Sequence, residues 1–485
     1  MSNKLSELIH NLSNQEKKYL KKKYNSAKKR LTLFNTIDKN EIYDERSIKK
    51  ELEKKDIKMN FTGLKKDLYD SILKYLRTYH SEHNKKVHIY ELLAEVELLQ
   101  EKNLREQASE RIGKAKKIAE EYHYDILMLK LLLIEKTNLR HQIKKENLTA
   151  LDKNHQDIEI YLEKVTNSFR LTKLYDDMFF LMRSKKLDEN IEEKAKELID
   201  SSLDKLSPVT SFESKMAYHS IWIMYYKHFD EETKHFIVHA KIMLDFFEET
   251  PNLIREFSQR YIHFVSSYLN GLAIMKDYSK FPENIAKLEN LSSKIKEKEN
   301  IQIKLFENIS YLTMIWHLGV QNYPKALTIL PDIEEGLEKY GNKVSAPHRI
   351  GFRQTISLTY LHNQQYEKAL DSLNKVLNNS KDQSLPDVQL FCRIIRLIIY
   401  FELNEKRGDY YKRCESEARS ILRAVGASKQ NMNFIGLVAK GIQRALGKMP
   451  DKQKSIFEKL YTEVSLLKGY INGKNQVLIW LQRKI

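Results

Sequence analysis

The 485-residue chain is long enough to bury one large core or several, and its 41% hydrophobic and 31% charged residues suit a soluble protein with long exposed helical faces. With 14 glycines and 8 prolines, tight turns and structureless loops must be few. Lys, Glu, Leu and Ile dominate and alternating β-branched runs are scarce, so the composition predicts an all-α fold.

The formal net charge of +17 is concentrated at the two ends of the chain. Residues 1–90 contain 22 Lys and Arg against 12 Asp and Glu, residues 431–485 contain 10 against 3, and the middle is neutral. This asymmetry favours an acidic partner at the ends over a uniformly basic character.

Membrane insertion and secretion are not expected from this sequence. The N-terminus lacks the apolar region of a signal peptide, and the most apolar segments, residues 125–135 and 394–401, are short and interrupted by Lys130 or Arg396. The two cysteines lie far apart and outside any metal-ligand spacing, which predicts buried thiols in a reducing compartment. We therefore expect a cytoplasmic protein.

The first 86 residues are predicted to form a basic helical domain. Ser13 and Glu16 make a capping box that opens a helix expected to run to about Arg30. A second helix is expected at residues 31–37 and a loose segment at residues 51–60. A strong amphipathic helix then begins near Asn60 or Thr62, and residues 80–86 form a polar linker.

The predicted first helix carries eight positive charges between residues 17 and 30 and no acid after Glu16. Crowded like charges repel, and a polyanion would relieve this repulsion and release counterions. Tyr19 and Tyr24 are interleaved and would stack on bases. The candidate polyanion-binding residues are Lys17, Lys18, Lys21, Lys22, Lys28, Lys29 and Arg30.

The alternative interpretation of this segment is an ordinary solvated lysine-rich face. Apart from Arg30 and Asn25, the segment lacks the Arg, Asn and Gln residues expected for reading base edges, and no helix-turn-helix with a short Gly-containing turn is evident, so binding to phosphates is favoured over sequence-specific binding. A membrane surface is less suitable as a partner because the segment has no bulky apolar face.

Residues 87–430 read as a series of helical hairpins. Apolar residues recur at helical spacing in pairs of segments, with Pro208 and Pro251 opening new joints. The predicted helices cover residues 87–102, 104–122, 124–145, 154–183, 188–206, 211–229 and 232–248.

The later hairpins repeat with a measurable period. Phe281, Tyr323, Tyr366 and Tyr410 are each expected to begin the second helix of a hairpin, at spacings of 42, 43 and 44 residues. Prolines follow two of these aromatic residues, at a first-turn position where the missing N–H costs nothing. These offsets indicate an internal repeat, of which residues 352–379 are the clearest unit.

Two of these helix starts, NYPKAL at residues 322–327 and QYEKAL at residues 365–370, resemble the second-helix start of tetratricopeptide (TPR) repeats. A small residue stands three positions after each aromatic, and Tyr360 takes the first-helix position. The period of 42–44 residues exceeds the TPR length of about 34, by about one turn per helix. Pro331 is also expected to kink or end its helix early.

The resemblance implies a superhelical array of antiparallel hairpins whose concave face binds a peptide or helix of a partner protein. Family positions that line this groove fall on Asn308, Tyr311, Gln354 and His362. The alternative is that these four are ordinary packed or solvated helix residues.

No catalytic, cofactor-binding or metal-binding constellation is evident, so a non-enzymatic protein is expected. His235 and His239 lie at i,i+4, but the motif lacks the Glu of a zincin helix and a third ligand. No Gly-rich phosphate loop, GxSxG elbow or kinase motif occurs.

Residues 431–485 are basic and amphipathic and are predicted to cap the array, with a docking tail anchored by Trp480 as the alternative. Two functional hypotheses follow. The first is a protein–protein interaction scaffold that uses the concave face of the repeats. The second is a nucleic-acid-associated regulator whose basic N-terminal domain contacts phosphates while the repeats bind a peptide or protein partner.

Overall fold

The structure is a computed structural model of the chain. None of its described residues belongs to a strand. This confirms the predicted all-α class. The structure describes residues 4–40, 44–53, 60–81, 84–141, 146–183, 190–203, 209–229, 234–295, 299–377, 386–426, 432–467, 471 and 473–485. The expected joint at Pro208 lies outside these ranges. So do residues 54–59, which make up most of the segment expected to be loose.

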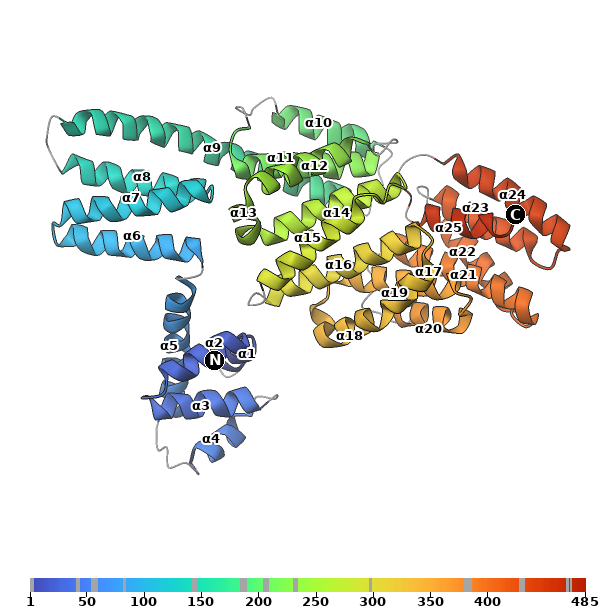
Figure 1. Cartoon of the computed structure of the whole chain (residues 1–485), viewed down its shortest axis with the longest axis horizontal. Helices are drawn as coiled ribbons and strands as arrows, with labels where there is room; N and C mark the ends of the chain where they lie inside the picture. The colour runs from blue at the N-terminus through green and yellow to red at the C-terminus, as the bar shows by residue number, and fades with distance from the viewer. Residues whose placement is uncertain are drawn as a thin grey trace. The chain divides into compact units, whose positions relative to one another are not determined.

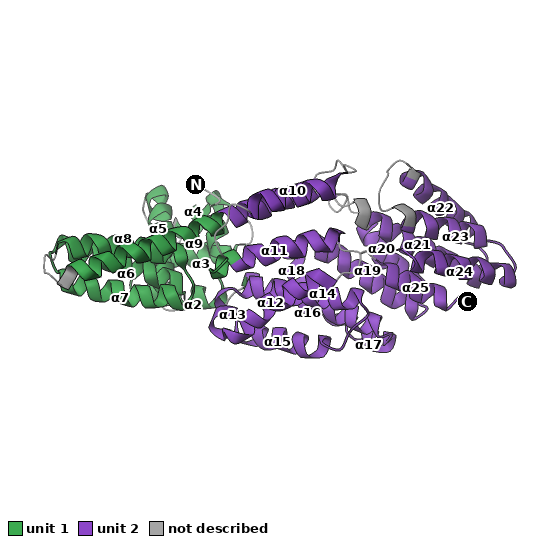
Figure 2. Cartoon of the chain, turned by 90° about the horizontal axis from the view of Figure 1, so that it is seen from above, with its two compact units in different colours: residues 1–169, 207–214, 297–299 green, residues 170–206, 215–296, 300–485 purple. Residues whose placement is uncertain are grey.

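The chain forms two compact units, coloured separately in Figure 2. Unit 1 comprises residues 1–169, 207–214 and 297–299, and unit 2 comprises the remainder. The helices of unit 1 are α1 (Lys4–His10), α2 (Asn14–Lys23), α3 (Lys28–Lys39), α4 (Glu45–Glu53), α5 (Phe61–Ser81), α6 (Lys85–Glu101), α7 (Arg105–Glu121), α8 (Asp125–Arg140) and most of α9 (Glu146–Arg183).

Helices α1 to α5 enclose a core of their own. Fully buried apolar residues from all five helices meet there, among them Ile9, Leu20, Phe34, Ile48 and Leu68. The capping box that the sequence predicts is present at the start of α2: the Ser13 N–H donates to Glu16 Oε2 at 2.7 Å and the Glu16 N–H to Ser13 Oγ at 3.3 Å.

The expectation of one helix running from Ser13 to about Arg30 is wrong. α2 ends at Lys23, four residues form a turn, and α3 begins at Lys28. Asn25 and Ser26 lie in this turn, where short polar side chains compete with helical hydrogen bonding. The predicted start of a helix at residue 154 is also wrong, because α9 begins at Glu146.

The helices of unit 2 are α10 (Ile191–Leu203), α11 (Phe212–Phe229, shared with unit 1), α12 (Lys234–Glu249), α13 (Pro251–Glu256), α14 (Ser258–Ile274), α15 (Phe281–Lys294), α16 (Glu299–Gly319), α17 (Tyr323–Thr328), α18 (Leu330–Tyr340), the short 3₁₀ helix η1 (Gly341–Lys343), α19 (Ala346–His362), α20 (Tyr366–Leu377), α21 (Pro386–Arg407), α22 (Tyr411–Gly426), α23 (Met432–Ala445), α24 (Pro450–Ser465) and α25 (Lys474–Gln482). Many helices of unit 2 pack against a neighbour in the chain, as in the pairs α19–α20, α21–α22 and α23–α24 (Figure 1).

The second helices of the hairpins begin where the sequence repeat places them. α15, α17 and α20 start at Phe281, Tyr323 and Tyr366, and α22 starts one residue after Tyr410. Each of the first three aromatic residues is buried, so it closes the base of its hairpin against the preceding helix. The repeat is therefore a repeat of structure as well as of sequence.

The joints between paired helices share one geometry. The residue that ends the turn has a positive φ at Lys276 (61°), Gln321 (58°) and Gln364 (59°). The next N–H then reaches back five residues, as in the bond from Gln365 N–H to the Tyr360 carbonyl at 2.9 Å. This is the Schellman arrangement, which satisfies the last carbonyls of a helix and reverses the chain within a few residues. In unit 1 the α6–α7 and α7–α8 joints repeat it, at Asn103 and His123.

Pro331 breaks the second helix of its hairpin, as expected. α17 stops at Thr328 and α18 starts at Leu330 with Pro331 in its first turn, where the ring does not remove a helical hydrogen bond. Leu330 and Ile333 then pack with Phe352 of α19 in a buried cluster.

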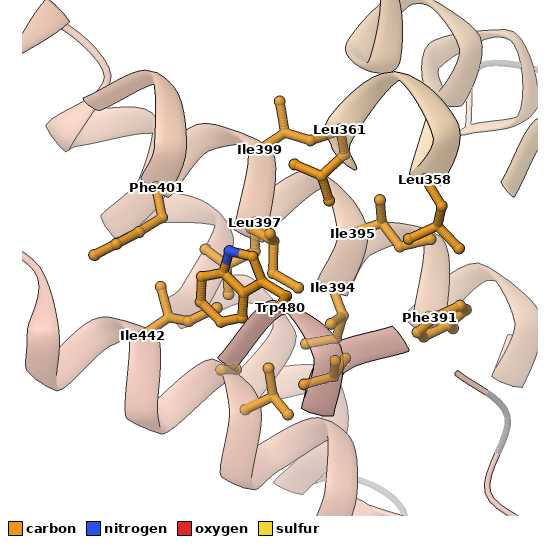
Figure 3. Packing of buried hydrophobic residues seen from close by; sticks show 14 of the residues in the cluster. Leu358, Leu361, Phe391, Ile394, Ile395, Leu397, Ile399, Phe401, Ile442 and Trp480 are labelled. Carbon is orange, nitrogen blue, oxygen red and sulfur yellow. The ribbon is translucent and has the colours of Figure 1, made fainter. Parts of the chain in front are cut away.

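The last helices close over the hairpins α19–α20 and α21–α22. Trp480 of α25 lies among Leu397, Phe401 and Ile442 in Figure 3, and its indole N–H donates to Glu402 Oε1 at 2.7 Å. It is 3% exposed. This burial fits the predicted cap and removes Trp480 as an exposed anchor for a partner. No described helix has an apolar run long enough to traverse a bilayer.

Candidate functional site

Three of the predicted polyanion-binding residues are engaged inside the N-terminal bundle. Lys17 and Lys21 both donate to Asp38 at 2.8 Å, and Arg30 forms a two-point ion pair with Asp67, at 2.7 and 2.9 Å. These bonds join α2 to α3 and α3 to α5. The sequence did not reveal them because the acids are 17 to 37 residues away from their partners.

Two carboxylates of the bundle, Asp38 and Glu16, have lowered pKa values. Burial alone would raise the pKa of Asp38, but its bonds to Lys17 and Lys21 outweigh burial and lower it. The same balance lowers the pKa of Glu16, where bonds to His80 and Ser13 outweigh burial. Both carboxylates are therefore held in the charged form by groups of the bundle itself.

The remaining predicted lysines form a free basic surface on either side of the α2–α3 turn. Lys18 and Lys22 are exposed on α2, Lys28 and Lys29 are exposed in the first turn of α3, and none of them pairs with a carboxylate in the described part of the chain. Lys23, which the candidate set omitted, is exposed beside them, with its ammonium 5.5 Å from the Tyr19 ring centroid. We call these five residues the α2–α3 lysine surface.

Tyr24 does not support the expected stacking on bases. Its side chain is fully buried, its hydroxyl lies 2.8 Å from Ser71 Oγ, and burial raises its pKa to about 12. Tyr19 is half-buried against Tyr79, with ring centroids 4.9 Å apart. The α2–α3 lysine surface therefore offers positive charge but little aromatic area.

The four predicted groove residues make contacts inside unit 2. Asn308 is buried and accepts a bond from Ser266 at 2.7 Å, and Gln354 is buried and donates to Cys392 Sγ at 3.2 Å. Tyr311 is half-buried against Phe352.

His362 is buried and stacks on Tyr323 with centroids 4.5 Å apart, and burial lowers its pKa to about 3. Three of the four predicted groove residues are thus buried within unit 2, and Tyr311 is half-buried. Burial leaves Asn308, Gln354 and His362 little surface to offer a partner.

A surface pocket lies instead at the break before Pro331. It has a volume of about 250 Å³ and is lined by Leu327, Leu330, Pro331, Glu334, Tyr360, Gln365 and Lys368. Its residues come from α17, α18, α19 and α20 and from the turn before α20, so two successive hairpins build it. We call it the Pro331 pocket.

The side chains at the mouth of the Pro331 pocket are held in place. Glu334 forms an ion pair with Arg353, and the Lys368 ammonium lies 5.7 Å from the Tyr360 ring centroid. Half-burial raises the pKa of Tyr360. Sequence reasoning singled out Pro331 and Tyr360 separately, but it did not show that a break in one hairpin opens a pocket against the next.

His239 of the HFIVH motif has a partner from another helix. Its Nδ1 lies 2.8 Å from Nδ1 of His219 on α11, and burial, together with the neighbouring His239, lowers the pKa of His219 to about 4. One imidazole of such a pair must be neutral to accept the bond. Within the described residues, no group of three His, Cys, Asp or Glu side chains is placed to hold a metal ion.

No family model, curated protein or solved structure matches this chain. The candidate binding sites of this protein are therefore the α2–α3 lysine surface and the Pro331 pocket.

Proposed function

We propose that the protein is a non-enzymatic interaction scaffold whose helical hairpins bind a segment of a partner protein. The observation that carries the proposal is the Pro331 pocket, because it is a concave site built jointly by two repeats. Stacked hairpins expose continuous surfaces of this kind, which other helical-repeat proteins use for binding. The resemblance to TPR repeats at residues 322–327 and 365–370 supports the same role.

The chemistry of the Pro331 pocket indicates what the partner supplies. Leu327, Leu330 and Pro331 give it an apolar wall, while Glu334 and Lys368 place one charge of each sign at its edge. A volume of about 250 Å³ accommodates one or two side chains rather than a large cofactor. The partner segment would insert an apolar side chain and satisfy the edge charges with flanking polar groups.

A pull-down from cell extract with matched variants tests the scaffold proposal. Lys368→Glu reverses an exposed edge charge and Gln365→Trp fills the pocket, so both should abolish recovery of proteins that the unmodified chain retains. Arg419→Gln changes an exposed residue of α22 that pairs with Glu415, and it should leave recovery unchanged. Equal recovery with all variants would remove the Pro331 pocket from the account.

The second hypothesis is supported by a separate observation, the α2–α3 lysine surface. Five exposed lysines gathered at one turn attract a polyanion, and each phosphate contact releases counterions. Because Tyr24 is buried and the surface lacks arginine, it would hold the phosphate backbone without reading sequence. On this view the N-terminal bundle contacts nucleic acid while the hairpins bind a protein partner.

Retention on immobilised DNA across a salt series tests the second hypothesis. The full chain should be retained at low salt and released as salt rises, and Lys22→Gln/Lys28→Gln/Lys29→Gln should lower the salt-dependent slope by about three. The control removes the same charge at the other basic end, with Lys448→Gln/Lys452→Gln/Lys454→Gln. Absence of retention at low salt would reject nucleic-acid binding and leave the scaffold proposal intact.

The scaffold proposal places the protein in the cytoplasm. Its two cysteines, Cys392 and Cys414, are buried free thiols, and burial raises their pKa to about 11 and about 12. Both are thus protonated and unreactive near neutral pH, as in structural thiols of a reducing compartment.

A further inference from the structure

Helices α21 and α22 pack against each other near the C-terminal end of unit 2 (Figure 1). A second pocket is lined by residues of these two helices. It is open to solvent and has a volume of about 340 Å³. Its lining consists of Arg396, Tyr400, Lys412, Arg413, Ser416 and Glu417. Three of the six are permanently cationic at neutral pH, which distinguishes it from the mixed Pro331 pocket.

Glu417 organises the floor of this pocket. Its Oε1 accepts a bond from Arg393 Nε at 2.9 Å and its Oε2 accepts one from Arg396 Nη2 at 2.8 Å. The Glu417 side chain is 11% exposed, and those of the two arginines are 20% and 19% exposed. One carboxylate therefore fixes two guanidinium groups while neutralising one of their two charges.

Arg396 retains donor capacity beyond its bond to Glu417. Its Nε–H is buried and has no hydrogen-bond acceptor in the part of the chain that the structure describes. This Nε–H is covered by protein atoms, so it is the exposed 19% of the Arg396 side chain that faces solvent. Arg396 lines the pocket, and its guanidinium therefore adds positive charge where an anion would bind.

The rim of the pocket carries two more cations. Lys412 and Arg413 are exposed and form no ion pair with a described carboxylate. The Arg413 guanidinium lies 5.1 Å from the Tyr410 ring centroid, and Tyr410 packs on Tyr400 at 5.7 Å. This stack orients the Arg413 guanidinium and leaves its positive charge unneutralised.

We propose that this pocket binds a phosphate monoester. Arg393, Arg396, Lys412 and Arg413 provide four positive charges around a single carboxylate, an excess of three that a dianion balances better than a carboxylate would. Three phosphate oxygens can accept bonds from the guanidinium and ammonium groups and from the hydroxyls of Ser416 and Tyr400. The remaining volume admits the group that bears the phosphate.

The inference is independent of the scaffold proposal. The phosphate can belong to a small metabolite or to a phosphorylated side chain of a protein, since both present the same dianion. The Pro331 pocket is built from other residues, so loss of one site leaves the other unchanged.

Isothermal titration of the full chain tests the phosphate pocket. The probes are phenyl phosphate, inorganic phosphate and a short peptide with one phosphoserine, all in a phosphate-free and sulfate-free buffer. The controls are phenol, buffer alone and the same peptide with an unmodified serine. We expect saturable binding that Lys412→Gln/Arg413→Gln weakens at least about 10-fold, since it removes two charge-assisted bonds. Arg419→Gln, which removes an equivalent charge from the same helix, should bind as the unmodified chain does.

The arms also identify the source of the phosphate. Tighter binding of phenyl phosphate than of the peptide supports a small-molecule ligand, and the reverse order supports a phosphorylated protein. Absence of saturable binding by all three probes would overturn the inference, as would equal affinity in the double variant. Thermal melting of each variant verifies folding, because Lys412 and Arg413 are exposed and their loss should leave the melting temperature unchanged.

Discussion

The N-terminal bundle α1–α5 and the C-terminal helices α19–α25 use charge in opposite ways. In the bundle, Lys17 and Lys21 form ion pairs with Asp38, and Arg30 forms one with Asp67. These ion pairs connect the helices around a small apolar core. In the C-terminal helices a large apolar cluster holds the structure together, and the cations at the α21–α22 pocket surround one carboxylate in excess. Net charge alone therefore does not show which lysines and arginines are free to bind a partner.

This difference separates net charge from binding capacity. A count of lysines between residues 17 and 30 points to the N-terminus, yet part of that charge is internal to the fold. The α21–α22 pocket sits in a stretch that is neutral overall, because acids elsewhere in the same stretch balance its cations. The predictions that follow test whether packing dominates at one end and ion pairs at the other.

The largest effect should come from the C-terminal apolar cluster. Phe401 is fully buried and its ring packs edge-on against Phe457 and Trp480, with centroids 5.5 and 6.2 Å away. Phe401→Ala should lower the free energy of unfolding by about 3–5 kcal/mol, because the cavity cannot collapse between the two remaining rings. Chemical denaturation followed by the fluorescence of the three tryptophans measures this. Met449→Ala, at a residue 73% exposed, should change it by less than about 0.5 kcal/mol.

A smaller effect is expected at the start of α25. Gly473 has φ of 78°, and a Cβ there would lie 1.9 Å from the Phe391 ring. Gly473→Ala should therefore cost about 2–3 kcal/mol, from the left-handed backbone and the clash together. Gly408→Ala separates the backbone cost from the cost of the clash, because Gly408 has φ of 81° but open space around it. This variant should cost about 1 kcal/mol. Equal losses in denaturation would show that α25 is not seated against Phe391.

A stabilising change is expected at a hairpin joint. Gln364 has φ of 59°, which a non-glycine side chain adopts with strain, so Gln364→Gly should raise the free energy of unfolding by about 0.5–1 kcal/mol. Lys368→Gly, inside α20, should lower it by about 1 kcal/mol because glycine is a poor helix former. A loss of stability in both variants would contradict the Schellman geometry of the joint.

The smallest effect belongs to the ion pairs of the bundle. The pKa of Asp38 is lowered in the folded state, so its stabilisation is complete above its ordinary value near 3.8 and is lost as the pH falls through the folded value. Asp38→Asn should cost about 0.5–1 kcal/mol near pH 7, and this cost should shrink as the pH falls below 3.8. Amide exchange of α2 and α3, corrected for its intrinsic pH dependence, measures this. A loss that persists at acid pH would assign the role of Asp38 to packing instead of charge.

Local signals in the sequence predicted much of the fold. Ser13 and Glu16 gave the start of α2, Tyr323 and Tyr366 gave the starts of α17 and α20, and Pro331 gave the helix break, because caps, repeats and prolines act through neighbours in the chain. The end of α2 was missed because its lysines suit a helix, while Asn25 and Ser26 in the turn and the burial of Tyr24 stop it.

The candidate site was less predictable because it depends on contacts between distant segments. Gln354 looks like a groove residue by position, but its amide faces Cys392 of the next hairpin at 3.2 Å. Glu417 lies seven residues after Tyr410, at the position where the three earlier repeats have leucine. Its bonds to Arg393 and Arg396 explain why a carboxylate takes that place. A polar residue at an apolar repeat position was the available sign of a site.

The central claim, that a partner segment occupies the Pro331 pocket, is tested most directly by site-specific photo-crosslinking in cells. A residue with a small aliphatic diazirine at position 365, too small to fill the pocket as tryptophan would, is compared with the same residue at position 419 on the exposed face of α22. The account predicts a discrete crosslinked partner at position 365 that is absent at position 419 and is lost when Lys368→Glu is added. Identical products at both positions, or a position-365 product that survives Lys368→Glu, would contradict it.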